Sequence, residues 1–319
     1  MKKRKLLSLK FASLLMVFVL VVGCTGSKAE QKVWKKAASE IYSELEKSAK
    51  ASKGSATDQD VSDENAEGIS DEDGLENGKA KNESKGNGGD FQSDGMEIPV
   101  YTKGKISETI KKRYSYTVSY NHEMKNPNWV AWTITANHAS GKVQRMDFSD
   151  DEDMPDPKGY LSDYYNSGYD RGHMCPAGDN KWSEKAMEDC FLITNMCPQN
   201  GGLNRGAWNS IEQQCRAWAK KYGKVYVVCG PIYLNKQHRK IGKNKVVVPE
   251  AFFKVVLCTK GTPKAIGFIC RNQSQKGKDK ADFINTIDEV ERITGYDFFS
   301  KLPDHVEKKV EAHADINEW

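Results

Sequence analysis

The sequence is short of several features, and each absence excludes a class of protein. Its eight cysteines include no CxxC pair, which argues against a structural zinc site. The apolar stretch at residues 11–22 is shorter than the about 20 residues that a membrane-spanning helix needs. Aromatic side chains are nearly missing from residues 51–95, where Phe91 is the only one. A segment so poor in apolar groups cannot offset the entropy of ordering its backbone.

The aromatic-poor segment is also strongly acidic. It holds twelve Asp and Glu residues against four Lys residues, a net charge of −8. Gly, Ser and Asn make up much of the remainder, so we expect residues 51–95 to form an acidic disordered linker. Residues 24–50 precede it and carry apolar side chains near helical spacing among many Lys and Glu. We expect this part to be an anchor-proximal helical segment.

The N-terminal residues have the parts of an export signal. Basic residues at positions 2–5 are followed by the apolar stretch and by small residues, which predicts a signal peptide over residues 1–23. The exit, Val21-Val22-Gly23-Cys24, resembles a bacterial lipobox, in which the cysteine after the cleavage site carries lipid. This predicts lipidation at Cys24 and a lipid-anchored protein of the bacterial cell envelope, either periplasmic or surface-exposed. The alternative is an ordinary signal peptide that is followed by an unmodified cysteine.

Residues 96–319 have a globular composition and a length that suits one domain. Their charge is uneven, because residues 221–280 hold twelve Lys and two Arg against two acids, a net charge of +12. A basic half is typical of a protein that binds a polyanion such as nucleic acid. The alternative is general surface charge that keeps the protein soluble.

The seven cysteines after Cys24 are an odd number, so at least one thiol stays unpaired within the chain. An exported protein permits disulfides. Three cysteines are candidates for a local bridge: Cys175, Cys190 and Cys197. Three others lie in apolar runs and are expected in the core: Cys229, Cys258 and Cys270.

Hydrophobic periodicity predicts an α+β fold with a mostly antiparallel central sheet flanked by helices. Alternating or β-branched runs predict strands at residues 115–120, 129–135, 142–148, 191–194, 224–229, 252–258 and 265–270. Helical spacing predicts helices at residues 206–221, 283–294 and 303–312. The residues that carry chemistry fall on one strand–loop–helix stretch of this pattern.

The segment Asp170-Arg171-Gly172-His173 places a cation two residues from an imidazole. His173 is the candidate general base, because imidazole titrates near neutrality and can take a proton from water. Arg171 and the upstream Arg145 are candidates to stabilise the negative charge that develops in a phosphodiester transition state. Gly172 would let the backbone pass closely between the two reactive side chains.

A second segment supplies oxygen ligands. Asn204 stands where a helix is expected to start, and its neutral carbonyl suits a hard cation such as Mg²⁺. Glu212 follows eight residues later, within about 80° of the same helix face, and could hold a metal-bound water. Each residue alone has a plainer explanation, since a lone His is usually structural and an Asn at a helix start is usually a cap. Their occurrence together in this order favours phosphodiester hydrolysis.

These blocks resemble the DNA/RNA non-specific endonuclease family, the ββα-metal nucleases that include mitochondrial endonuclease G. The resemblance runs from Arg145-Met146-Asp147-Phe148 through residues 164–177, 195–199, 203–208, 225–233 and 248–255, and it covers most of residues 115–275. It implies the ββα-metal nuclease fold and a Mg²⁺ or Mn²⁺ cofactor. It also implies cleavage of DNA and RNA that reads the backbone rather than the bases and leaves 5′-phosphate ends.

The resemblance also implies roles for particular residues. His173 matches the general base of the family, and Asn204 matches its direct metal ligand. Glu212 matches an acid that orients metal-bound water. Arg171 matches the arginine of the motif, and Arg145 an arginine further upstream.

One supporting residue and two departures complete the comparison with the family pattern. Asn195 matches an asparagine beside the site that helps to fix its geometry. Cys175 and Cys197 stand where the family more often has small or hydroxyl residues. They raise the question of redox control but remove no catalytic group.

The sequence thus predicts a metal-dependent, sugar-non-specific endonuclease. One alternative is a catalytically silent nucleic-acid-binding module on the same fold. Retention of both the base and the metal ligand argues against it. The other alternative is a phosphodiesterase that acts on small nucleotides, and the basic residues spread over 221–280 favour a long polyanion instead.

Overall fold

A computed structural model describes residues 94–319. The predicted signal peptide, the lipidated Cys24, the helical segment and nearly all of the acidic linker lie outside the described residues. Among the helices of the described part, none combines the length and apolar character that crossing a membrane would require.

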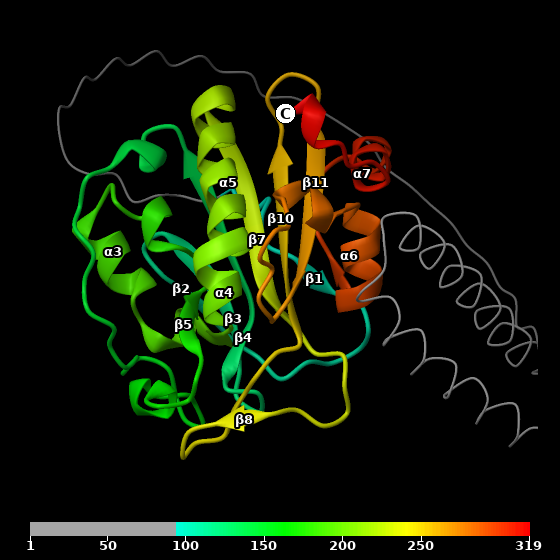
Figure 1. Ribbon diagram of the computed structural model, residues 1–319. Coiled ribbons are helices and arrows are strands. Elements are labelled where there is room, and N and C mark those ends of the chain that lie inside the picture. The colour runs from blue at the N-terminus through cyan, green and yellow to red at the C-terminus, as the bar shows by residue number, and fades with distance from the viewer. Residues whose placement is uncertain (1–93) are drawn as a thin grey trace, which may run out of the picture. The chain divides into compact units, whose positions relative to one another are not determined.

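The centre of the described part is a seven-stranded sheet in which every neighbouring pair is antiparallel. This confirms the predicted α+β class (Figure 1). In spatial order the strands are β12 (Ile284–Asn285), β11 (Lys264–Arg271), β10 (Ala251–Cys258), β7 (Lys224–Ile232), β4 (Asn126–Thr135), β3 (Tyr116–Asn121) and β2 (Thr109–Lys112).

Short elements surround this sheet. Three two-stranded pairs are β1 (Val100–Tyr101) with β13 (Tyr296–Asp297), β5 (Asp170–His173) with β6 (Met196–Gln199), and β8 (Lys240–Ile241) with β9 (Val246–Val247). The α-helices are α3 (Glu184–Cys190), α4 (Gly201–Leu203), α5 (Asn209–Tyr222), α6 (Ile287–Thr294) and α7 (Asp304–Glu311).

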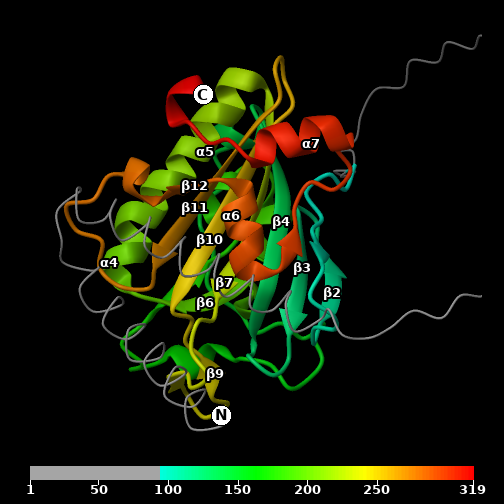
Figure 2. The ribbon, with the colours of Figure 1, turned by 90° about the vertical axis from the view of Figure 1, so that its right-hand side faces the viewer.

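Helices cover both faces of the sheet because its central strands are apolar on both sides. Along β7, Val225 and Val227 join one hydrophobic cluster, whereas Tyr226 and Val228 join another. Helix α5 packs on the first face through Ile211, and α6 packs on the second through Ile287. Figures 1 and 2 show α5 on one side of the strands and α6 with α7 on the other.

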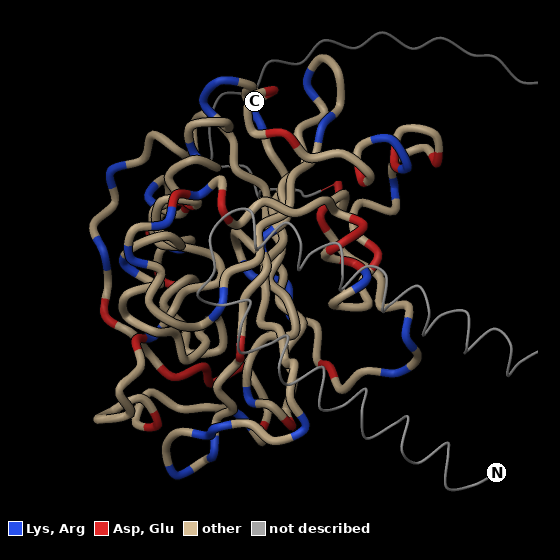
Figure 3. The backbone as a smooth tube through the Cα atoms, turned by 45° about the vertical axis from the view of Figure 1, so that its right-hand side comes forward, with Lys and Arg blue, Asp and Glu red and all other residues tan. Residues whose placement is uncertain are grey.

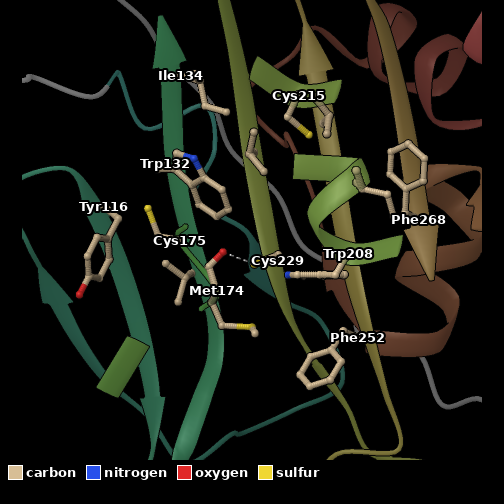
Figure 4. Close-up of a cluster of buried hydrophobic side chains, with 14 of the residues drawn as sticks. Tyr116, Trp132, Ile134, Met174, Cys175, Trp208, Cys215, Cys229, Phe252 and Phe268 are labelled. Carbon is tan, nitrogen blue, oxygen red and sulfur yellow. Dashed lines mark hydrogen bonds between the residues drawn. The ribbon is translucent and has the colours of Figure 1, made fainter. Parts of the chain in front are cut away.

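The cluster beneath α5 is built from large aromatic side chains and sulfur groups (Figure 4). Trp208, just before α5, packs against Phe252 of β10 with ring centroids 5.7 Å apart. The thiol of Cys229 in β7 donates a hydrogen bond of 3.1 Å to the carbonyl of Met174. Because Met174 directly follows His173, this bond ties the end of β5 to the central sheet.

The site-bearing part of the fold is a ββα unit. Strands β5 and β6 form an antiparallel pair in which Gly172 lies opposite Cys197. Gly172 is required there, because a Cβ atom would come within 2.3 Å of the Gln199 side chain. After β6 the chain passes directly into α4, a π-helical turn at Asn204–Trp208, and then α5.

Two predicted strands are wrong. Residues 142–148 form no strand, although Val143 N donates to Lys181 O. Their alternating side chains are mostly exposed, and alternation on a surface segment resembles that of a half-buried strand. Residues 191–194 contribute only an isolated bridge and the start of a 3₁₀ turn, because the hairpin strand begins at Met196.

The helix predictions need smaller corrections. The helix predicted at 206–221 is confirmed as α5, but the helical segment begins earlier, at Gly201. The helix predicted at 283–294 begins only at Ile287, where Thr286 Oγ1 caps it by accepting from Glu289 N. The last predicted helix is confirmed as α7.

The candidate bridge among Cys175, Cys190 and Cys197 is not formed, because all seven cysteines of the described part are free and buried. The thiol of Cys175 accepts a hydrogen bond from Asn180 Nδ2, and that of Cys190 donates to Met187 O. These thiols therefore pack as small core groups. The expected burial of Cys229, Cys258 and Cys270 is confirmed.

Candidate active site

A pocket of about 770 Å³ opens beside the ββα unit. Five residues singled out from the sequence line it together: Arg145, Arg171, His173, Asn204 and Glu212. They come from the irregular segment before β5, from β5 itself, from the π-helical turn and from α5. Residues up to 67 positions apart in the chain therefore share one cavity, as the sequence motifs predicted.

His173 lies between two phenylalanine rings. Its ring centroid is 5.3 Å from that of Phe148 and 4.9 Å from that of Phe191. Its Nε2 atom is buried and has no hydrogen-bond partner in the described part of the chain. Burial, followed by the charges of Arg145 and Arg171, lowers the pKa of His173 to about 3. The imidazole is therefore neutral at physiological pH, and its Nε2 atom is left to accept or donate one further hydrogen bond.

The two arginines flank this aromatic arrangement. The Arg171 guanidinium lies 4.4 Å from the Phe148 ring centroid, and that of Arg145 lies 5.0 Å from the Phe191 centroid. Each cation thus stacks on a ring that in turn contacts His173. The pocket consequently offers two positive charges beside an uncharged imidazole, which is an arrangement that favours an anion.

Asn204 is held by Asp170 of the same motif. The amide Nδ2 of Asn204 donates to Asp170 Oδ2 at 2.9 Å, and Arg205 Nη1 donates to the same oxygen at 2.6 Å. With its nitrogen engaged, Asn204 keeps its carbonyl oxygen for another partner. The expected place at a helix start is wrong: the helical segment is capped by Asn200, whose Oδ1 accepts from Gly202 N and Leu203 N.

The π-helical turn changes how Asn204 relates to Glu212. The helical segment is kinked within this turn, so the regular helical spacing that placed the two positions about 80° apart does not apply across it. The turn opens at Gly206, whose φ of −102° and ψ of −110° are not helical. Both side chains consequently face the same pocket.

Glu212 is a poorly solvated acid at the pocket wall. Desolvation, with a smaller contribution from Asp179, raises the pKa of its carboxyl to about 7, although Lys254, Arg216 and Arg145 act in the opposite direction. A carboxyl near this pKa exchanges a proton readily at neutral pH. A bound cation would favour its ionised form.

These residues fit a hard divalent cation. Asn204 supplies an oriented neutral oxygen, and Glu212 supplies an acidic one on the same face. Mg²⁺ binds oxygen atoms and takes only a few of them from the protein, because it keeps several of its waters.

Asn195 lies beneath the site rather than in it. Its Oδ1 accepts from Cys175 N at 3.0 Å, and its Nδ2 donates to Cys175 O at 2.9 Å and to Cys190 O at 2.8 Å. Its own carbonyl accepts from Met174 N. The buried side-chain amide therefore ties Cys175 to the end of α3, and the backbone carbonyl of Asn195 holds Met174.

Several residues of the site were missed from the sequence. No sequence pattern near His173 predicts its ring contacts with Phe148 and Phe191. The contact with Phe191 depends on the tertiary packing around the β5–β6 pair. The link between Asp170 and Asn204 likewise joins positions 34 residues apart. The only hint in the sequence is that an acid, Asp170, stands directly beside the motif arginine.

Two basic segments reach the edges of the site. Arg239 lies 5.1 Å from the ring centroid of Tyr169, which lines the pocket. On the other side of the π-helical turn, Lys276, Lys278 and Lys280 line a hollow together with Gly206. Part of the basic charge of residues 221–280 therefore borders the elements that carry the site.

An anion-binding pocket with a neutral imidazole base is what phosphodiester hydrolysis requires. The family model described as DNA/RNA non-specific endonuclease matches residues 95–305. The chain belongs to this family.

Individual relatives agree with this assignment. The chain is 36% identical over 218 residues to the mitochondrial nuclease of Saccharomyces cerevisiae, a match that covers 61% of this chain and 66% of the yeast protein. It is 31% identical over 214 residues to a nuclease of Nostoc sp., covering 63% of this chain and 76% of that one. The match therefore spans just under two thirds of the yeast relative.

A solved structure shares the fold. It is entitled "Crystal structure of the EndoG/EndoGI complex: Mechanism of EndoG inhibition". The two chains superpose with a TM-score of 0.59 at 32% identity, covering 62% of this chain and 88% of that chain. The endonuclease G-like ββα fold predicted from the sequence is confirmed.

Proposed function

We propose that the chain is a metal-dependent, sugar-non-specific endonuclease that hydrolyses phosphodiester bonds of DNA and RNA and leaves 5′-phosphate ends. The observation that carries this proposal is the buried, unpaired Nε2 of His173 in a pocket shared with two guanidinium groups and the oriented amide of Asn204. The family and the relatives named as nucleases support it.

Each side chain has a defined task in this mechanism. His173 Nε2 accepts the proton of the attacking water, which its neutral state allows. Arg171 and Arg145 stabilise the charge that develops on the phosphate. Glu212 accepts hydrogen bonds from water and orients it. Mg²⁺, or Mn²⁺, held through Asn204, would neutralise the phosphate and the leaving 3′-oxygen.

Two substitutions test this mechanism. His173→Ala should lower cleavage of supercoiled DNA and of RNA by about 10²–10⁴-fold, the usual contribution of a general base. Asn204→Ala should raise the Mg²⁺ concentration needed for half-maximal rate. Circular dichroism and melting curves would establish that both variants stay folded. Undiminished cleavage by folded His173→Ala would refute the assignment of His173 as the base. If the wild type binds nucleic acid without metal and never cleaves it, the silent binding module is favoured instead.

We also propose that the nuclease is a lipoprotein of the bacterial cell envelope, periplasmic or surface-exposed, in which Cys24 carries the lipid and residues 51–95 serve as the linker. The sequence Val21-Val22-Gly23-Cys24 supports this. Labelled fatty acid should enter the full chain and stay with the membrane fraction, whereas Cys24→Ser should be unlabelled. Cys258→Ser, which alters a buried thiol, is the matched control. An unlabelled wild-type chain would contradict the proposal.

A further inference from the structure

The face of the sheet opposite the pocket carries a cluster of acidic side chains. Helices α6 and α7 and strand β13 bring five carboxylates together: Asp288, Glu291, Asp297, Glu307 and Glu311. One oxygen from each of Asp288, Glu291 and Glu311 lies within 4.8 Å of the others, and the same holds for Asp297, Glu307 and Glu311. Glu311 belongs to both triads and is the centre of this carboxylate cluster.

The negative charge of the carboxylate cluster is not balanced by ion pairs. Among the ion pairs of residues 94–319, none involves a member of the cluster. By contrast, Asp170 and Asp179 are each paired with an arginine. Figure 3 shows acidic positions gathered where α6 and α7 lie.

Glu311 gives an independent sign that a partner belongs here. The residue is only 8 % exposed, and its Oε1 atom is buried without a hydrogen-bond partner. A buried, unsatisfied carboxylate oxygen is costly, so native structures usually provide it with a donor or a cation.

We propose that the carboxylate cluster binds one Ca²⁺ ion, with Glu311 as its central ligand. Ca²⁺ takes six to eight oxygen ligands at about 2.3–2.6 Å in flexible geometry, so ligands on opposite sides of one ion are about 4.6–5.2 Å apart. In each triad one oxygen of every member lies within 4.8 Å of the other two, so a single ion of this size can contact all three. Mg²⁺ is less suitable, because it demands a tighter octahedron and usually takes one or two carboxylates.

This ion would have a structural task. Its ligands come from three successive elements near the end of the described chain, and α6 and α7 each contact β11 of the central sheet. Binding would offset the mutual repulsion of the carboxylates and hold α7 against α6. The site lies across the sheet from His173 and is independent of the proposed cleavage chemistry.

Melting of the metal-stripped full chain tests the site directly. With CaCl₂ at about 100-fold above its Kd, the melting temperature should rise by about 5–10 °C. Glu311→Gln should abolish the rise, and Asp288→Asn should reduce it. Glu289→Gln is the matched control on α6, since Glu289 pairs with Arg292 outside the cluster and should leave the rise unchanged. Asn204→Ala, which alters the other proposed metal site, should also keep it.

The outcomes separate the alternatives. Without Ca²⁺, Glu311→Gln should melt close to the wild type, because the amide has nearly the same size as the carboxyl and carries no charge. Its loss of response is then not a loss of fold. Absence of a Ca²⁺ effect in the wild type, or a full effect in Glu311→Gln, would overturn the proposal. An equal, Glu311-dependent rise with MgCl₂ at the same concentration would overturn the choice of Ca²⁺.

Discussion

At the scale of single residues, the surroundings of His173 oppose its protonation. Phe148 and Phe191 exclude water from the ring, and the nearby guanidinium groups repel a positive imidazole, so its pKa falls to about 3. The proposed general base is therefore weak in the free protein. A phosphate bound between Arg145 and Arg171 would offset their charge and raise the pKa of His173, so the base would strengthen when substrate is present.

The depressed pKa of His173 should also affect folding. Between pH 6.5 and about 3 the unfolded chain binds a proton at this position and the folded chain does not. Stability from this group is therefore fully present above pH 6.5 and is lost as pH falls. The loss should approach about 1.4 kcal/mol per pH unit. Urea unfolding of wild type and His173→Asn at pH 7, 6 and 5 measures it, and parallel pH dependences would contradict the shift.

At the scale of elements, burial explains which predictions succeed. The strands at 224–229, 252–258 and 265–270 are buried on both faces, so they appear as continuous apolar runs that a helix or a loop seldom produces. The π-helical turn has no comparable pattern in the sequence. The kink at Gly206 does not disturb the helical spacing of Ile211, Cys215 and Trp218, which follow it. The motif residues were predicted, but their contacts depend on how β5, β6 and the turn close together.

The bond between β5 and the π-helical turn should control metal affinity. Asp170→Ala releases the Asn204 amide, so the carbonyl loses its fixed direction. We expect the Mg²⁺ concentration for half-maximal rate to rise by about 10–100-fold, the usual effect of losing a residue that orients a ligand. The rate at saturating Mg²⁺ should change less.

A matched variant separates orientation from charge. Arg205→Gln breaks the other contact of Asp170 but leaves Asn204 bound, and the Arg205 side chain is 72% exposed. It should therefore alter Mg²⁺ dependence little. Equal effects of Asp170→Ala and Arg205→Gln would show that the local charge, and not the orientation of Asn204, sets the affinity.

At the scale of the whole described part, the sheet separates two kinds of surface. The face under α5 carries the pocket, and the basic loop at residues 276–280 borders the turn that precedes α5. The other face carries the carboxylate cluster. Nucleic acid would be attracted to the first face and repelled from the second. This polarity favours a substrate long enough to extend beyond the pocket.

Salt dependence distinguishes such a substrate from a small nucleotide. If DNA contacts the loop at 276–280, Lys276→Gln with Lys278→Gln should reduce the slope of log kcat/KM against log NaCl by about 1–2, because each lost phosphate contact removes about 0.9. The control pair, Lys308→Gln with Lys309→Gln, removes equal charge from the exposed side of α7. It should leave the slope nearly unchanged. A shallow slope in the wild type would identify a small-nucleotide phosphodiesterase, and equal effects of both pairs would show attraction to net charge rather than contact with this loop.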